Sequence, residues 1–165
     1  MGGNGLLSVY LSQEGDAYAL LAKALALNGV FTLPPIQRHP GGKPYFPTMP
    51  HLHFNLSHSG ALCLCALSDA PVGVDVERIR PRRAGLPRYC MEDAEYSAYL
   101  AAGEGWEEFY RIWTLKEAWA KQTGQGLGQP RNWPTPPPLP HRSYRGEGFW
   151  VSVCGLEHPG GLISL

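Results

Sequence analysis

Two short segments of the sequence carry charged residues at spacings that suit metal binding. Segment 72–77 reads Val-Gly-Val-Asp-Val-Glu and predicts a strand with Asp75 and Glu77 on one face, because strand side chains alternate. Segment 106–123 predicts a helix on which Glu117 and Lys121, one turn apart, project to the same side. If the strand and the helix pack together, three carboxylates converge beside one lysine.

Three carboxylates held close together repel one another unless a positive charge lies between them. A hard divalent cation such as Mg2+ meets that need, and it usually keeps waters and binds substrate phosphate oxygens as further ligands. The competing interpretation is a strand end that faces water and a surface ion pair between Glu117 and Lys121, worth about 0.3–0.5 kcal/mol. The apolar neighbours in both segments favour the metal site, since they indicate that strand and helix are largely buried.

Two further segments carry residues that suit phosphate binding. Residues 57–60 read Ser-His-Ser-Gly after a strand predicted at 53–56, and a turn of this kind offers hydroxyls, backbone N–H groups and an imidazole. Lys43 follows two glycines and precedes Pro44, so it is a candidate cation for a phosphorylated ligand. A structural role for His58 and a solvated charge at Lys43 remain open as alternatives.

The composition narrows the class of protein. A chain of 165 residues with zero formal net charge predicts one compact domain, or two small halves that share a core, and argues against a nucleic-acid binder. No apolar run is long enough to span a membrane, and no signal peptide is expected from the N-terminal residues. The four cysteines fit neither a zinc site nor a redox pair, so we expect reduced thiols and a cytoplasmic protein.

Strands and helices are expected in mixed order, which indicates an α+β fold. We predict strands at 5–11, 53–56, 62–68, 72–77 and 149–154, and helices at 16–27, 92–101 and 106–123. The strands at 62–68 and 72–77 are expected to pair as a hairpin across the short connection 69–71. Residues 130–140 contain six prolines and predict a stiff surface loop that is neither helix nor central strand, with a weaker interpretation as a ligand of SH3-type domains.

Taken together, these residues resemble the 4'-phosphopantetheinyl transferase superfamily, specifically its larger, surfactin-synthetase-activating type, shortened at the N-terminus. The resemblance runs in order through four segments, which are 42–44, 54–60, 73–77 and 109–121, and residues 92–96 are similar to an acidic segment of the family. Each motif alone is weak, but four in the same order with compatible spacing are specific.

Enzymes of this family move the phosphopantetheine arm of coenzyme A to a serine hydroxyl of an apo acyl or peptidyl carrier protein, and release adenosine 3',5'-bisphosphate. The resemblance implies the following roles: Asp75, Glu77 and Glu117 hold Mg2+, with Mn2+ as an alternative ion; Glu117, Lys121 and Asp75 are catalytic; and Lys43, Pro44, Ser57, His58 and Lys121 bind coenzyme A. The expected partners are therefore coenzyme A and a carrier protein, with no nucleic acid and no membrane.

The resemblance also implies an α+β fold built as a pseudo-two-fold arrangement of two similar halves, with the active site in the cleft between them. Residues 1–70 would form the nucleotide side and residues 71–165 would carry the metal ligands and catalytic groups. Both halves lie in one chain, so a monomer is expected. The segment before the first helix lacks the basic residues that larger members place near the 3'-phosphate, which motivates an alternative: a non-catalytic module that binds coenzyme A or a carrier protein.

Overall fold

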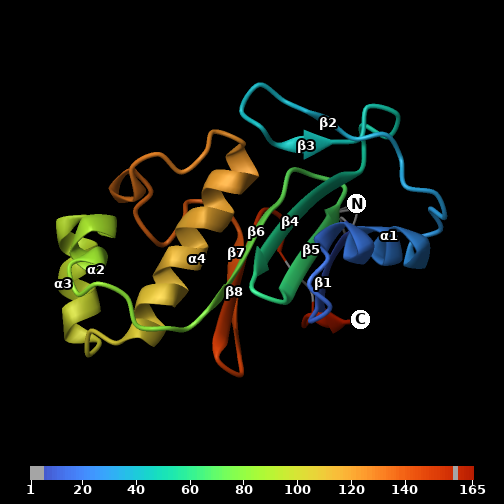
Figure 1. Ribbon diagram of the computed structural model, residues 1–165. Coiled ribbons are helices and arrows are strands. Elements are labelled where there is room, and N and C mark those ends of the chain that lie inside the picture. The colour runs from blue at the N-terminus through green and yellow to red at the C-terminus, as the bar shows by residue number, and fades with distance from the viewer. Residues whose placement is uncertain (1–5, 158–159) are drawn as a thin grey trace.

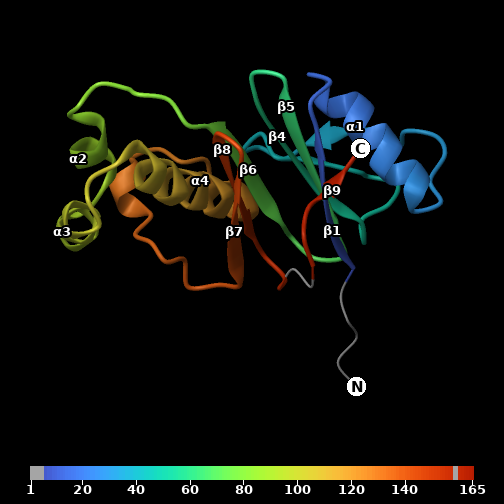
Figure 2. The ribbon, with the colours of Figure 1, turned by 90° about the horizontal axis from the view of Figure 1, so that it is seen from below.

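Two sheets lie face to face between helices in the computed structural model, which describes residues 6–157 and 160–165 (Figure 1). Across the molecule the order is α4, the second sheet, the first sheet and α1, and the view in Figure 2 agrees with it. The expected mixed α+β class is therefore confirmed. No helix within the described ranges has both the length and the apolar character needed to cross a membrane.

The first sheet has the strand order β4-β5-β1-β9, with α1 on its outer face. Its elements are β1 (Leu7–Ser12), α1 (Ala17–Leu27), β4 (His53–Ser59), β5 (Leu62–Ser68) and β9 (Ile163–Ser164), and a small hairpin of β2 (Gln37–Arg38) and β3 (Pro44–Tyr45) stands beside it. Every residue of β5 is buried, because one face packs under α1 and the other against the second sheet. Cys63 and Cys65 lie on the α1 face as free thiols, as the sequence predicted.

The second sheet has the order β6-β8-β7, and α4 covers its outer face. Its elements are β6 (Gly73–Arg78), α2 (Leu86–Cys90), α3 (Asp93–Ala101), α4 (Trp106–Thr123), the 3-10 helix η1 (Pro130–Asn132), β7 (His141–Gly146) and β8 (Phe149–Cys154). Gly73 allows α4 to approach β6 closely, since a Cβ there would lie 1.9 Å from the carbonyl oxygen of Ala118. Val74 and Val76 face inward, into the core between the two sheets.

Three sequence-based expectations are wrong. β5 and β6 do not form a hairpin: β5 pairs with β4 and β1, whereas β6 crosses into the second sheet and pairs with β8. Residues 57–59 are not a turn but the end of β4, because β5 pairs with β4 along its whole length. The proline-rich segment begins with a 3-10 helix and buries Pro130 and Trp133, so it is not wholly a surface loop.

The two sheets are joined where the edges of β4 and β6 meet. No backbone ladder connects these strands; instead, side chains of β4 accept hydrogen bonds from the backbone N–H groups of β6. Asn55 Oδ1 accepts from Val74 (2.9 Å), Ser57 Oγ from Val76 (3.2 Å), and Ser59 Oγ from Arg78 (3.1 Å). The three acceptors are every second residue of β4, and the three donors are every second residue of β6, as the strand period of two requires. These side chains therefore set the register of β6 against β4. We call this contact the seam.

Removal of one seam side chain is expected to destabilise the protein measurably. Asn55→Ala leaves the buried N–H of Val74 without an acceptor, which costs about 1–3 kcal/mol. Urea denaturation should show a lower midpoint with an unchanged slope. Asn132→Ala, at an exposed position, is the matched control and should change the free energy of unfolding by less than about 0.5 kcal/mol. Equal stability of the two variants would contradict the role given to Asn55.

Candidate active site

Residues from β6 and α4 converge beside the seam, as the sequence predicted. Lys121 Nζ donates to Asp75 Oδ1 (2.8 Å) and to the carbonyl oxygen of Val74 (3.2 Å). Glu117 lies one turn before Lys121. Burial raises the pKa of its carboxyl group, and the negative charges of Asp75 and Glu77 raise it further. The three carboxylates and the lysine therefore share one region of the molecule.

Serines of β4 hold the two acids of β6 in place. Ser57 Oγ donates to Asp75 Oδ1 (2.9 Å), and Ser59 Oγ donates to Glu77 Oε2 (2.8 Å). Each serine therefore uses its hydroxyl twice, as acceptor for the backbone of β6 and as donor to a carboxylate. The second oxygen of Asp75, Oδ2, is buried and has no hydrogen-bond partner. A buried oxygen of this kind is an open position for a cation.

All three carboxyl groups have raised pKa values, chiefly because they are buried. Burial raises the pKa of Asp75 against the opposing effects of Lys121 and Ser57. Burial and the charge of Asp75 raise the pKa of Glu77, and the same two causes raise that of Glu117 to about 7. A single lysine does not balance this acidic group, and a divalent cation would lower all three pKa values.

The donor set fits a hard cation, although the side chains are not arranged as a finished metal site. Within residues 6–157 and 160–165, no group of three or more His, Cys, Asp or Glu side chains meets the geometry for holding a metal ion. Asp75 is bound to Lys121 and Ser57, and Glu77 is bound to Ser59. A cation at this place would meet the unpartnered Oδ2 of Asp75, because Oδ1 is already bound to Lys121 and Ser57. Oxygen ligands that include carboxylates are those preferred by Mg2+ and Mn2+.

Lys43, in the loop before β3, packs beside the start of β6 and the end of α4, close to Glu117 and Lys121. Its ammonium donates to the carbonyl oxygens of Val72 (3.0 Å) and Gln122 (2.8 Å), and burial lowers its pKa to about 8. A cavity of about 190 Å³ opens beside it. The cavity is lined by Gly41, Gly42, Lys43, Asn55, Glu117, Ala120, Lys121, Gly124, Gly126 and Leu127. Lys43, Glu117 and Lys121, which were singled out in different parts of the sequence, thus line one cavity.

Pro44 and His58 lie apart from this group. Pro44 pairs with Arg38 in the β2–β3 hairpin and does not line the cavity. His58 is exposed, and it projects from the face of β4 opposite to Ser57 because neighbouring strand residues alternate. Ser57 and His58 therefore cannot meet one ligand from the same side of the strand.

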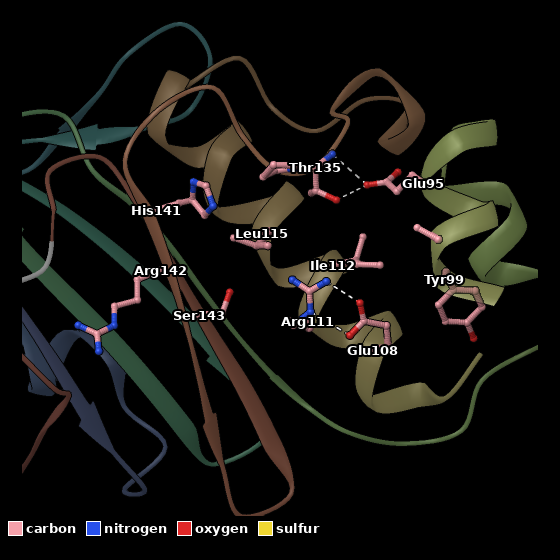
Figure 3. Close-up of a pocket in the computed structure, with 12 residues that line it drawn as sticks. Glu95, Tyr99, Glu108, Arg111, Ile112, Leu115, Thr135, His141, Arg142 and Ser143 are labelled. Atoms are coloured by element: carbon pink, nitrogen blue, oxygen red, sulfur yellow. Dashed lines mark hydrogen bonds and ion pairs between the residues drawn. The ribbon is translucent and has the colours of Figure 1, made fainter. Parts of the chain in front are cut away.

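A buried ion pair on the other side of α4 was not predicted. Lys116, which is 0% exposed, donates to Glu95 Oε2 (2.6 Å) and to the carbonyl oxygens of Trp133 (2.8 Å) and Pro130 (3.3 Å). Glu95 Oε1 also accepts from the backbone and hydroxyl of Thr135, as Figure 3 shows. The pair links α3, α4 and the proline-rich segment. A lysine within a helix normally predicts an exposed position, so the burial of Lys116 could not be predicted from residue type.

Trp133 carries this link to the cavity. Its indole N–H donates to the carbonyl oxygen of Leu127 (2.6 Å), and its ring packs edge-on against Trp119 with centroids 4.9 Å apart. Leu127 lines the cavity beside Lys43. Contacts thus run from the buried pair of Lys116 and Glu95 through Trp133 to Leu127, which lines the cavity.

A larger cavity of about 540 Å³ lies on the face of α4 that carries Leu115 (Figure 3). Leu115 and Glu117 are two residues apart and project to opposite sides of the helix. This cavity is therefore separate from the candidate site. It is lined by Glu95, Ala98, Tyr99, Glu108, Arg111, Ile112, Leu115, Thr135, Pro136, His141, Arg142 and Ser143.

Comparison with known proteins identifies the family of this chain. The model of the 4'-phosphopantetheinyl transferase superfamily matches residues 71–153, and the chain belongs to this superfamily. The chain is 40% identical over 91 residues to the 4'-phosphopantetheinyl transferase Sfp of Bacillus subtilis (strain 168), covering 54% of this chain and 41% of that protein. It is 44% identical over 117 residues to the 4'-phosphopantetheinyl transferase AcpT of Escherichia coli (strain K12), covering 67% and 59%. The chain thus spans about half the length of these curated relatives.

Glu117 should titrate near neutral pH in protein freed of metal with EDTA. Its folded pKa of about 7 lies above the ordinary 4.5, so the folded state holds the proton more tightly than the unfolded state. The free energy of unfolding should therefore fall as pH rises from about 4.5 to about 7, by roughly 1–3 kcal/mol after allowance for solvent screening. Glu117→Gln should remove this part of the slope. NMR of the labelled carboxyl measures the pKa directly, and titration near pH 4.5 would refute the assignment.

The buried pair should be much more important for stability than an exposed pair of the same type. Lys116→Met leaves the carboxylate of Glu95 buried beside an apolar chain and should cost about 3–5 kcal/mol. Lys23→Met breaks the exposed pair with Glu14 and should cost less than about 1 kcal/mol. Urea denaturation compares the two. A loss below 1 kcal/mol in Lys116→Met would show that the pair is dispensable.

Proposed function

We propose that the protein is a Mg2+-dependent 4'-phosphopantetheinyl transferase that uses coenzyme A to modify a serine of an apo acyl or peptidyl carrier protein. The observation that carries this proposal is the meeting of Asp75, Glu117 and Lys121 beside the seam, next to an unpartnered buried oxygen of Asp75. All three residues lie within the segment matched by the superfamily model. Sfp and AcpT bear the name of this activity, which supports it further.

The metal is assigned to Asp75, Glu77 and Glu117, and when bound it would neutralise charge on the pyrophosphate of coenzyme A. The serine hydroxyl of the carrier attacks the phosphorus that bears the pantetheine arm. The new oxygen–phosphorus bond forms as the bond to the bridging oxygen of the pyrophosphate breaks, and adenosine 3',5'-bisphosphate leaves.

The side chains of this protein supply proton transfer and charge stabilisation. Glu117, which lines the cavity together with Lys121, accepts the proton of the serine hydroxyl as general base. Lys121 stabilises the charge that develops on the leaving pyrophosphate. Ser57 holds Asp75 in position, and Lys43 lies in the cavity proposed for the nucleotide end of coenzyme A. Pro44 and His58 remain part of the proposed coenzyme A site only if coenzyme A extends beyond this cavity.

The proposal includes the two-half arrangement. Residues 1–70 would form the nucleotide half and residues 71–165 the catalytic half, related by a pseudo-two-fold axis, with the active site in the cleft between them. In support, each sheet has a helix packed on its outer face, α1 on one and α4 on the other. A monomeric cytoplasmic enzyme is proposed with it; both sheets come from one chain and all four cysteines are free thiols.

Mass spectrometry of apo carrier proteins tests the proposal. Wild-type protein with coenzyme A and Mg2+ should add the mass of the phosphopantetheine arm to a carrier, and EDTA should prevent it. Asp75→Asn and Glu117→Gln should each lower the rate by at least about 100-fold, because each removes a metal ligand or the base. Glu108→Gln, on the far face of the same helix, is the matched control and should keep the wild-type rate.

Binding of coenzyme A or of a carrier without any mass gain, across several carriers, would favour the non-catalytic alternative. Transfer at the normal rate by Asp75→Asn would show that the metal assignment is wrong.

A further inference from the structure

Three hydroxyl groups form a hydrogen-bonded row that runs from beneath α4 to the cavity of about 540 Å³ shown in Figure 3. Thr114 Oγ1 lies 2.7 Å from Ser152 Oγ, which lies 2.8 Å from Ser143 Oγ. Thr114 and Ser152 are both 0% exposed, whereas Ser143 is half-buried and lines the cavity. The row therefore connects the interior of the second sheet to this cavity.

The row can carry its protons in two directions, because each hydroxyl has one proton and can also accept. In the inward direction Ser143 donates to Ser152, Ser152 donates to Thr114, and Thr114 donates to the carbonyl oxygen of Arg111 (3.2 Å). In the outward direction Thr114 donates to Ser152 and Ser152 donates to Ser143, which leaves the proton of Ser143 for an acceptor in the cavity. A ligand with an acceptor group at this place would select the outward direction.

Arg111 on α4 presents a cation to the same cavity. Its Nε and Nη2 donate to the two carboxylate oxygens of Glu108, and its Nη1 makes no hydrogen bond to any residue that the structure describes. The guanidinium stands between Glu108 and β7, and Ser143 projects toward it from β7 (Figure 3). Arg111 and Ser143 thus offer donors from two facing walls, and a guanidinium is well suited to a carboxylate.

The charges around the cavity do not oppose an anion. The lining residues include two carboxylates, and both have a cationic partner: Glu108 pairs with Arg111, and Glu95 pairs with Lys116. Arg142 on β7 is a further lining residue. With Lys116 included, three cations stand against two carboxylates, so the charge around the cavity is net positive.

Apolar side chains form another part of the lining. Ile112 and Leu115 lie on α4 and are both buried, and Tyr99 on α3 and Pro136 add further apolar surface. The volume of about 540 Å³ lies within the range of about 300–1,000 Å³ that is usual for small-molecule sites. Such sites commonly combine an apolar lining with a few polar groups that fix the orientation of the ligand.

We propose that this cavity is a second ligand site, which binds the anion of a small carboxylic acid with an apolar body. The carboxylate accepts hydrogen bonds from Nη1 of Arg111 and from the hydroxyl of Ser143, and the apolar body lies on Ile112 and Leu115. The site is on the face of α4 opposite to Glu117, so its ligand does not compete with coenzyme A. This inference does not depend on the proposed function.

NMR of isoleucine methyl groups tests the site, with 4-phenylbutyrate as the probe and the uncharged 4-phenylbutanamide as its control. The signal of Ile112 should shift with a Kd on the order of 1 mM, as is usual for a ligand of this size, whereas Ile36 and Ile163, which do not line the cavity, should not shift. The amide should bind at least about 10-fold more weakly, because it cannot form a charge-assisted hydrogen bond with Arg111. Equal affinity for acid and amide, or no shift of Ile112, would overturn the proposal.

Substitution of the two donors should weaken the binding of phenylbutyrate. Arg111→Gln should raise its Kd about 10-fold, close to that of the amide, and Ser143→Ala should raise it about threefold. Lys23→Gln, which removes the cation of an exposed ion pair elsewhere, is the matched control and should leave the Kd within about twofold. An unchanged Kd in both Arg111→Gln and Ser143→Ala would show that the probe binds at another place.

A variant that fills the cavity keeps the test open if loss of a donor disturbs the fold. Ala98 lines the cavity from an exposed position on α3, so Ala98→Trp should block binding of the probe without removing any hydrogen bond. Ala101→Trp, at an exposed position of the same helix outside the lining, is its control and should bind as the wild type does. Saturating coenzyme A should leave the Kd of phenylbutyrate unchanged. Binding that survives Ala98→Trp, or displacement of the probe by coenzyme A, would overturn the proposal of a separate site.

Discussion

A carboxylate inside a protein needs donors or a cation beside it, and Asp75 is such a carboxylate, only 4% exposed. Its Oδ1 accepts from Ser57 on β4 and from Lys121 on α4, while Asp75 itself belongs to β6. Three elements from distant parts of the chain are therefore held at one group. Its other oxygen has no partner. The seam between the sheets and the proposed metal site thus share one buried carboxylate. For this reason the serines that hold the seam together also contact the candidate metal ligands.

Helix α4 is anchored on both of its faces by lysines that meet buried acids. Lys121 contacts Asp75 on the seam side, and Lys116 contacts Glu95 on the side of α3. Glu117 follows Lys116 directly and precedes Lys121 by one turn, so its place is fixed by both contacts. The charge attraction within each pair contributes little net stability, because the cost of burying the two charges offsets much of it. Their shared effect is to hold one glutamate at a defined position.

The parts of the fold that could be predicted from the sequence are those with strong periodicity. α4 has the predicted bounds, and β6 and β8 lie where the apolar alternation indicated. β7 could not be predicted, because its polar residues show no apolar alternation. The hairpin of β5 and β6 was predicted because a short connection usually joins neighbouring strands. That prediction was wrong, since β5 is buried on both faces and β6 belongs to the sheet that covers one of them. Side-chain spacing located Asp75, Glu117 and Lys121; it could not locate Lys116, whose burial depends on three separate segments.

The central claim is that Asp75, Glu77 and Glu117 hold a divalent cation, and anomalous diffraction from crystals grown with Mn2+ and coenzyme A tests it most directly. The account predicts an anomalous peak beside these three carboxylates, within reach of Asp75 Oδ2. Bound coenzyme A with Mn2+ located away from these three carboxylates would contradict it.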